Sequence, residues 1–196
     1  MAHFICDFGN MVVGSSKKKA FKLFNVGKQP VTFNFDKKAL QTAGLIIEPD
    51  RANKLMPNCG MHFNVNFQTR KTAKFGMARH FIDIELYRGP TTVIEFCANL
   101  TIPELHISTD SVEFGEVVVG CRKTVKMRLE NHKEVPCHWS FFSRQDLASG
   151  SGKDGDRFSV RPASGHLAPG GKSVVDVMFI PSAEKEFQQK LAFKVA

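Results

Sequence analysis

The feature that most constrains the fold of this 196-residue chain is an internal repeat. When residues 8–35 are placed over residues 114–141 without a gap, ten of the 28 paired positions are identical. Random pairing of sequences with ordinary composition would give about two. Two related domains therefore stand in tandem. The identical residues of the first copy are Phe8, Gly9, Val12, Val13, Gly14, Lys17, Leu23, Asn25, Pro30 and Phe35.

The repeat continues at a second offset. Val65 matches Val177 and Phe67 matches Phe179, an offset of 112 in place of 106. Most of the difference is an insertion in the second copy, around residues 148–156, which is rich in glycine and serine. We expect the copies to meet near residues 101–103, so that the domains are residues 1–101 and 102–196.

Within each copy, apolar and polar residues alternate. Val31, Phe33 and Phe35 alternate with polar residues, and so do the apolar residues of 61–68, 82–86 and 94–98. The second copy repeats the pattern at 125–129, 137–141 and 175–179. A period of two indicates half-buried strands, and turn residues separate the runs. Copies of about 95 residues built from short strands predict an all-β fold of two tandem immunoglobulin-like β-sandwiches.

The two copies differ at their ends. An expected strand at 103–108 opens the second copy, whereas only seven residues precede Phe8, so the first strand of the first copy should be short or missing. The first copy closes with an alternating strand at 92–98, and the chain reaches Ala196 where the second copy should have its equivalent. We therefore expect a piece of a longer array, with an open sheet edge in the second copy.

The recurring motif resembles a known domain. The pattern F-G-x-x-x-V-G, a basic strand, N-x-x-x-x-P and an aromatic strand resembles the ASH domain, a branch of the major-sperm-protein (MSP) and PapD-like immunoglobulin superfamily. Residues 48–60 are similar to giant ASH-repeat proteins of the ciliary central apparatus. The resemblance implies a non-enzymatic structural repeat of an axonemal scaffold, located in the cytoskeleton of a cilium or flagellum and acting in ciliary motility through protein–protein contacts. The residues that carry the motif are Phe8, Gly9, Val13, Gly14, Asn25, Pro30 and Phe33, with Phe114, Gly115, Val119, Gly120, Asn131, Pro136 and Trp139.

Each position of the motif has a structural explanation. The glycines suit a bulge or bend, and the prolines end pairing at the edge of a sheet. The aromatic residues should fill the space between two sheets. In particular, Trp139 alternates with Cys137 and Phe141, which predicts that its indole is largely buried.

Positive charge is concentrated in the first copy. Residues 1–101 carry 14 Lys and Arg against 7 Asp and Glu, a net charge of +7, whereas residues 102–196 carry 13 against 12, a net charge of +1. One interpretation is a basic strand edge that prevents edge-to-edge pairing. The other is a surface for an acidic partner. The candidate partner-binding residues are Lys17, Lys18, Lys19, Lys22, Lys37 and Lys38.

The partners that the resemblance implies are axonemal proteins, among them the acidic tails of tubulin on microtubules, and neighbouring repeats of the same parent chain. Nucleic acid is disfavoured because aromatic residues do not interleave with the lysines. No apolar run is long enough to enter a membrane as a helix. The runner-up function is a peptide-binding adaptor or tether of the MSP type that recognises acidic motifs. A cationic groove on one sheet face would favour the adaptor, whereas charge spread along both edges would favour the scaffold.

No motif indicates an enzyme, a cofactor or a metal. Gly150-Ser-Gly-Lys153 resembles a phosphate loop, but Asp154 follows where magnesium binding needs Ser or Thr. Residues 154–156 lack the spacing of a calcium loop. Cys59 and His62 could supply two zinc ligands, but no second pair stands at finger spacing. The five cysteines, an odd number without a C-x-x-C motif, are expected to be reduced, buried thiols.

Overall fold

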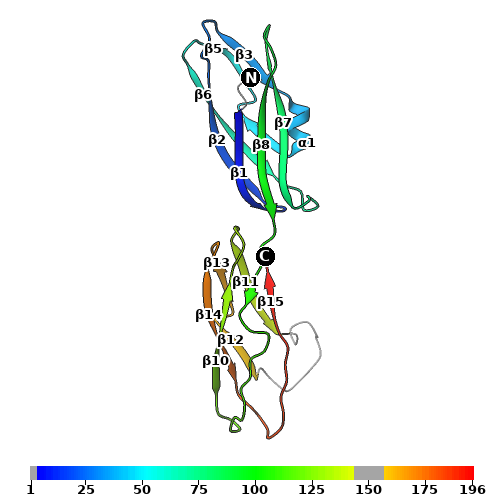
Figure 1. Ribbon diagram of the computed structural model, residues 1–196, viewed down its shortest axis with the longest axis vertical. Coiled ribbons are helices and arrows are strands. Elements are labelled where there is room, and N and C mark those ends of the chain that lie inside the picture. The colour runs from blue at the N-terminus through cyan, green and yellow to red at the C-terminus, as the bar shows by residue number, and fades with distance from the viewer. Residues whose placement is uncertain (1–3, 144–156) are drawn as a thin grey trace. The chain divides into compact units, whose positions relative to one another are not determined.

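The structure is a computed structural model that describes residues 4–143 and 157–196. It divides into two compact units, Met1–Ile102 and Pro103–Ala196. Strands dominate both units, and the described residues contain a single short helix (Figure 1). The predicted all-β fold class of immunoglobulin-like sandwiches is confirmed. The insertion at 148–156, with the phosphate-loop and calcium-loop patterns considered there, lies outside the described residues.

The first unit is a sandwich of two sheets. One sheet has the strand order β1-β8-β7-β3-β5 and the other the order β2-β6-β4. Strand β8 lies inside the larger sheet, parallel to β1 and antiparallel to β7. The elements are β1 (Phe4–Val12), β2 (Ser16–Phe24), β3 (Val31–Phe35), α1 (Lys37–Ala43), β4 (Leu45–Glu48), β5 (Arg51–Leu55), β6 (Gly60–Gln68), β7 (Gly76–Leu86) and β8 (Thr92–Thr101).

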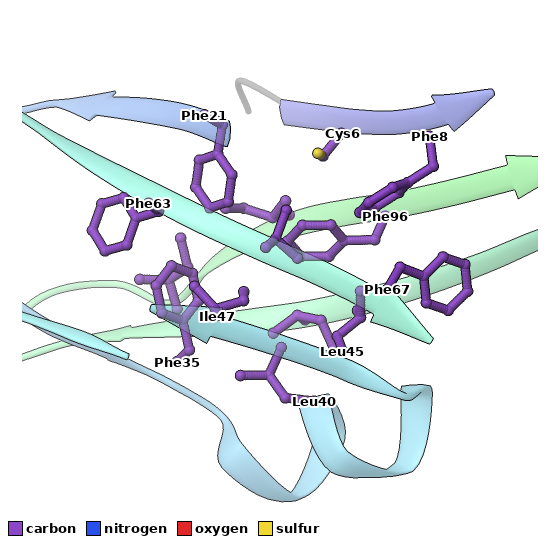
Figure 2. Close-up of a cluster of buried hydrophobic side chains, with 14 of the residues drawn as sticks. Cys6, Phe8, Phe21, Phe35, Leu40, Leu45, Ile47, Phe63, Phe67 and Phe96 are labelled. Carbon is purple, nitrogen blue, oxygen red and sulfur yellow. The ribbon is translucent and has the colours of Figure 1, made fainter. Parts of the chain in front are cut away.

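Phenylalanine rings from both sheets form the core of the first unit (Figure 2). The rings of Phe21 and Phe63 stack with centroids 5.4 Å apart, and Phe35 meets Phe63 edge-on at 5.4 Å. Each of these residues occupies an inward position of an alternating strand, as the period of two predicts. Burial of such large apolar side chains is the main stabilising contribution to a sandwich of this size.

Helix α1 was not expected from the sequence. Asp36 caps its first turn by accepting hydrogen bonds from the backbone N–H groups of Lys38 and Ala39. Gly44 ends it in a left-handed conformation with φ 74°. Seven residues are too few to establish a 3.6-residue period, and one buried residue, Leu40, ties the helix to the core. The pair of an aspartate cap and a glycine eight residues later was the signal available in the sequence.

The second unit repeats much of this plan. Its sheets have the orders β12-β14-β10-β9 and β13-β11-β15. Of the strand expected at 103–108, only His106–Ile107 forms, as β9, which pairs with β10. In the first unit, the described residues form no strand at the corresponding place, on the outer side of β2. The elements are β9 (His106–Ile107), β10 (Lys123–Glu130), β11 (Cys137–Ser143), β12 (Phe158–Arg161), β13 (Ser164–Leu167), β14 (Lys172–Phe179) and β15 (Leu191–Val195).

Trp139 occupies the centre of the second core, and its predicted burial is confirmed, because only 3% of its surface is exposed. It stands opposite Gly165 on β13. At the equivalent place in the first unit, Phe33 stands opposite Ala52 on β5. The larger ring thus faces the smaller neighbour, which keeps the volume between the sheets similar in the two units.

Candidate partner-binding surfaces

Strand β2 positions four of the six candidate lysines, and its alternation sends them to two faces. Lys17 and Lys19 lie on the same side of the strand as the buried Phe21, although both residues are exposed. The Lys17 ammonium donates a hydrogen bond to the backbone carbonyl of Phe8, and Lys19 donates to that of Asp7, each at 2.5 Å. Both carbonyls belong to β1, the edge strand of the other sheet. These two lysines therefore join the sheets and cover an exposed strand edge.

The interaction of Lys17 with β1 explains why the repeat has a lysine at this position in both copies, Lys17 and Lys123. Gly9 has a φ of 67° in a bulge of β1, and its N–H donates to the carboxylate of Asp7. A Cβ placed on Gly9 would lie 3.9 Å from the Lys17 ammonium. In the second unit, Gly115 has a φ of 59°, and the Lys123 ammonium lies at the same 3.9 Å. The lysine and the glycine thus form one structural pair in both copies.

Lys18 and Lys22 lie on the outward face of β2. Both side chains are exposed, and the Lys22 ammonium lies 4.4 Å from the centre of the Phe24 ring. Their neighbours across the sheet are Asn66 and His62 on β6. These two lysines remain available to a partner in solution.

The other two candidates, Lys37 and Lys38, begin helix α1. Lys37 forms a salt bridge of 2.5 Å with Asp50, and the hydrogen bond from Lys37 lowers the pKa of that carboxyl group. Helix α1 leads into β4, the edge strand of the sheet whose opposite edge is β2, and it lies beside β7 (Figure 1). The structure therefore brings the six lysines to two edges of the unit and does not gather them into one patch.

A buried asparagine in each unit bonds several backbone groups, and sequence reasoning had assigned it no role. The amide of Asn131, fully buried, donates to three backbone carbonyl groups. They belong to Val135 at 2.8 Å, Leu167 at 3.2 Å and Ala168 at 3.1 Å. In the first unit, the amide of Asn25 donates to two backbone carbonyls at 2.8 Å. The N-x-x-x-x-P motif is thus a buried clamp that fixes a turn against the neighbouring strands.

The cysteines and histidines do not assemble into a reactive site in the described residues. All five cysteines are free thiols, but the expectation that they are buried is wrong for Cys59 and Cys121, which are exposed. Burial raises the pKa of Cys6, Cys97 and Cys137, so these thiols stay protonated and are poor nucleophiles at neutral pH. The part of the chain that the structure describes holds no group of three or more His, Cys, Asp and Glu side chains that could bind a metal.

Glu130 is the centre of a small ionic cluster on the second unit. Its carboxylate accepts a hydrogen bond from His132 at 2.9 Å and lies 3.2 Å from the Lys172 ammonium. The hydrogen bond from His132, followed by that from Lys172, lowers the pKa of Glu130. The partners are exposed side chains of the same unit, so the cluster is a surface ion pair with a modest effect on stability.

A groove of about 1940 Å³ runs along the second unit. Residues 109–119 form one wall and residues 183–191 the other, and the aromatic rings of Phe158, Phe179 and Phe193 also line it. In the first unit, strand β8 occupies the corresponding place between β1 and β7.

The sequence comparisons agree with this architecture. Residues 103–196 match a family described as the HYDIN/CFA65/VesB-like, Ig-like domain. The human hydrocephalus-inducing protein homolog is 32% identical over 213 residues, which include all of this chain and 4% of that protein. Cilia- and flagella-associated protein 65 of Chlamydomonas reinhardtii is 29% identical over 106 residues, which include 54% of this chain and 5% of that protein. The chain therefore spans only a small fraction of the length of the relatives it matches.

A solved structure was also found to be similar, the ASH/PapD-like domain 7 of human CEP192. It is 27% identical, covers 40% of this chain and 61% of that chain, and has a TM-score of 0.33.

Both units are all-β sandwiches, and the family that residues 103–196 match is described as an Ig-like domain. The second unit is similar to the HYDIN/CFA65/VesB-like, Ig-like family, and the whole chain is similar to short segments of the human and mouse hydrocephalus-inducing proteins. The helix in the described residues is too short and too polar to cross a bilayer.

Proposed function

We propose that this chain is a non-enzymatic structural segment of a ciliary scaffold, which acts in the assembly and motility of the axoneme through protein–protein contacts. The observation that carries the proposal is the similarity to hydrocephalus-inducing proteins along the entire chain, at 32% identity in the human relative and 28% in the mouse. The similarity to an algal cilia- and flagella-associated protein supports the same location. The partners in this proposal are axonemal proteins, including tubulin, and neighbouring repeats of the same parent chain.

The placement of the lysines supports a scaffold over a peptide-binding adaptor. A receptor for acidic peptides needs its cations to converge on one groove. Here Lys18 and Lys22 lie on β2, whereas Lys37 and Lys38 lie at the start of α1, next to the opposite edge of the sheet. Charge at two edges suits contacts with neighbours on more than one side of the unit.

Proximity labelling tests the location and the partners. A biotin ligase is fused beside this segment within its full-length protein, in cells with motile cilia. We expect axonemal proteins to dominate the labelled set. Labelling dominated by membrane-tethered proteins with acidic motifs would contradict the scaffold and support the adaptor.

Co-sedimentation with microtubules tests tubulin as a direct partner. The variant that carries Lys18→Glu and Lys22→Glu should bind about tenfold more weakly, because each outward charge contributes up to about 1 kcal/mol. Binding should also depend less on salt. The matched control carries Lys126→Glu and Arg128→Glu, at exposed positions of β10 in the second unit. Equal losses in both variants would contradict a basic surface specific to the first unit.

A further inference from the structure

We infer that the outward face of β7 in the first unit is a docking surface for a second copy of the same chain. The two copies pack face to face about a two-fold axis that passes beside Phe81, with their β7 strands antiparallel. In this arrangement Arg79 of each copy meets Asp83 of the other. The inference concerns the purified chain and does not depend on the ciliary role.

The register of the larger sheet places exposed apolar side chains close together on this face. Phe81 pairs with Glu95 of β8, which in turn pairs with Ile5 of β1, so the three side chains form one row across the sheet, away from the core (Figure 1). Met77 and Val93 lie on the same side of their strands. Phe81, Met77 and Ile5 are each more than half exposed. Contiguous exposed apolar side chains of this kind mark interaction surfaces.

The composition of this face is that of a protein–protein interface. Arg79 is the single Lys or Arg among the residues of β1, β7 and β8, although the whole first copy carries 14. Interface cores are depleted of lysine and enriched in aromatic residues, methionine and arginine. Phe81, Met77 and Arg79 supply these three types within five residues of one strand. The face therefore suits a protein partner that covers its apolar side chains.

The order of charges along β7 favours a second copy as that partner. Arg79 precedes Phe81 by two residues and Asp83 follows it by two, so each charged residue lies about 7 Å from Phe81 along the strand. Both charged residues are exposed. When two copies meet with β7 antiparallel, opposite charges coincide on both sides of the axis, whereas a parallel arrangement would bring like charges together. Contacts of one surface with itself about a two-fold axis are also the commonest in homo-oligomers.

Glu95 holds Arg79 in place for this contact. It lies on the interior strand β8, between Ile5 and Phe81, and is buried although it belongs to the outward face. Its carboxylate forms a salt bridge of 3.5 Å with Nη1 of Arg79, which draws it toward the next row and away from the axis. A guanidinium group has five N–H donors, so Arg79 can hold Glu95 and still bind Asp83 of the second copy.

Sedimentation equilibrium of the purified 196-residue chain tests the apolar part of the contact. We expect a concentration-dependent dimer. Phe81→Ser should raise its dissociation constant by about tenfold or more, because aromatic residues at the centre of an interface carry much of the binding energy. The matched control is Phe24→Ser on β2 in the other sheet, where the residue is 58% exposed compared with 57% for Phe81. The control should leave the dissociation constant unchanged.

Charge reversals test the symmetry of the contact. Asp83→Arg should weaken the dimer by about tenfold or more, since two arginines then meet on each side of the axis. Glu48→Arg on β4 makes the same charge change in the other sheet and should have no effect. Mixing the Asp83→Arg chain with an Arg79→Asp chain should restore dimers that contain one chain of each kind, because every facing pair is again opposite in sign.

Circular dichroism shows whether each variant is folded. Arg79→Asp places a carboxylate beside Glu95, and if it unfolds the first unit, the contrast between Asp83→Arg and Glu48→Arg still decides. The inference is overturned if the chain stays monomeric at every concentration. It is also overturned if the dimer responds equally to the two phenylalanine variants or to the two single charge reversals, or if folded Asp83→Arg and Arg79→Asp chains do not associate when mixed.

Discussion

The two units start from related sequences but differ in the strand that lies inside the larger sheet of the first. In the first unit, β8 connects β1 to β7 and completes a five-stranded sheet. The second unit has sheets of four and three strands, and the segment equivalent to β1 stays extended without a ladder. The first phenylalanine of the motif F-G-x-x-x-V-G, Phe8 in one unit and Phe114 in the other, is buried in the core of both units.

The difference extends to the cores. In the described residues, the buried apolar cluster of the first unit has nineteen members and that of the second has ten. The second unit compensates in part for its smaller core. It has the larger side chain of Trp139 where the first unit has Phe33, and its Asn131 amide bonds three backbone carbonyl groups where Asn25 bonds two. Individual residues should therefore carry more of the stability of the second unit.

The largest effect is expected at Trp139. Trp139→Ala should cost about 3–5 kcal/mol, because it empties the centre of the smaller core. Phe33→Ala should cost a similar amount, but in the larger core of the first unit. Urea denaturation followed by circular dichroism should show the second unit unfolding first in the Trp139 variant. An unchanged midpoint and slope would contradict the central role of this side chain.

The asparagine clamp comes next. Asn131→Ala should destabilise the second unit by about 2–3 kcal/mol, because it leaves buried carbonyl groups without donors. Asn25→Ala should cost about 1–2 kcal/mol in the first unit, where fewer bonds are lost. Trp139 is the single tryptophan, so its fluorescence reports on the second unit alone. A midpoint shift in that signal for Asn131→Ala, but none for Asn25→Ala, is the expected result.

The pair of Trp139 and Gly165 provides a sharper comparison. A Cβ on Gly165 would lie 2.8 Å from the indole, so Gly165→Ala should cost about 1–3 kcal/mol through overpacking. Adding Trp139→Phe recreates the first unit's arrangement, in which a phenylalanine faces an alanine, and should recover part of that loss. A double-mutant cycle on the two sites measures the coupling. Additive effects would show that the two residues do not share one packing volume.

The smallest expected effect is a difference in the free energy of unfolding between lysine variants on the two faces of β2. Lys17→Met should cost about 0.5–1 kcal/mol, since it removes a hydrogen bond to the carbonyl of Phe8. Lys18→Met, on the outward face, should change the free energy of unfolding by less than about 0.5 kcal/mol. Lys123→Met tests the equivalent lysine of the second unit. Equal effects at Lys17 and Lys18 in thermal melts would contradict the division of the lysines between structure and surface.

Much of the fold follows from the sequence because the signals are local. The alternation of apolar and polar residues predicted the strands. Trp139 lies two residues from Cys137 and from Phe141, on the same face of its strand, and this placement predicted its burial. The same parity could have separated Lys17 and Lys19 from Lys18 and Lys22, since the first two share the face of Phe21. The Asn25 and Asn131 clamps were visible as identities, but their partners lie up to 37 residues away and depend on how the strands are brought together.

The rest depends on tertiary contacts. Helix α1 is too short for a periodic pattern, and its single anchor, Leu40, gives no repeat to detect. Residues 112–118 match β1 in sequence and differ from it in structure, because the partner strand and not the segment itself decides whether a ladder forms. The two groups of lysines, at β2 and at α1, are separated by strand order, which a linear pattern of charges does not encode.

The hydrogen bonds of Lys17 and Lys19 to β1 also bear on how such a chain avoids misfolding. Adjacent domains with related sequences can exchange strands during synthesis, and the resulting swapped or aggregated species are a hazard of multidomain and repeat proteins. An ammonium group bound to an edge carbonyl occupies an acceptor that a strand from the next domain would need, and it must be dehydrated and displaced before that strand can pair. The lysines thereby raise the barrier to mistaken pairing along β1, while leaving the interior edge that β8 fills free for the correct partner.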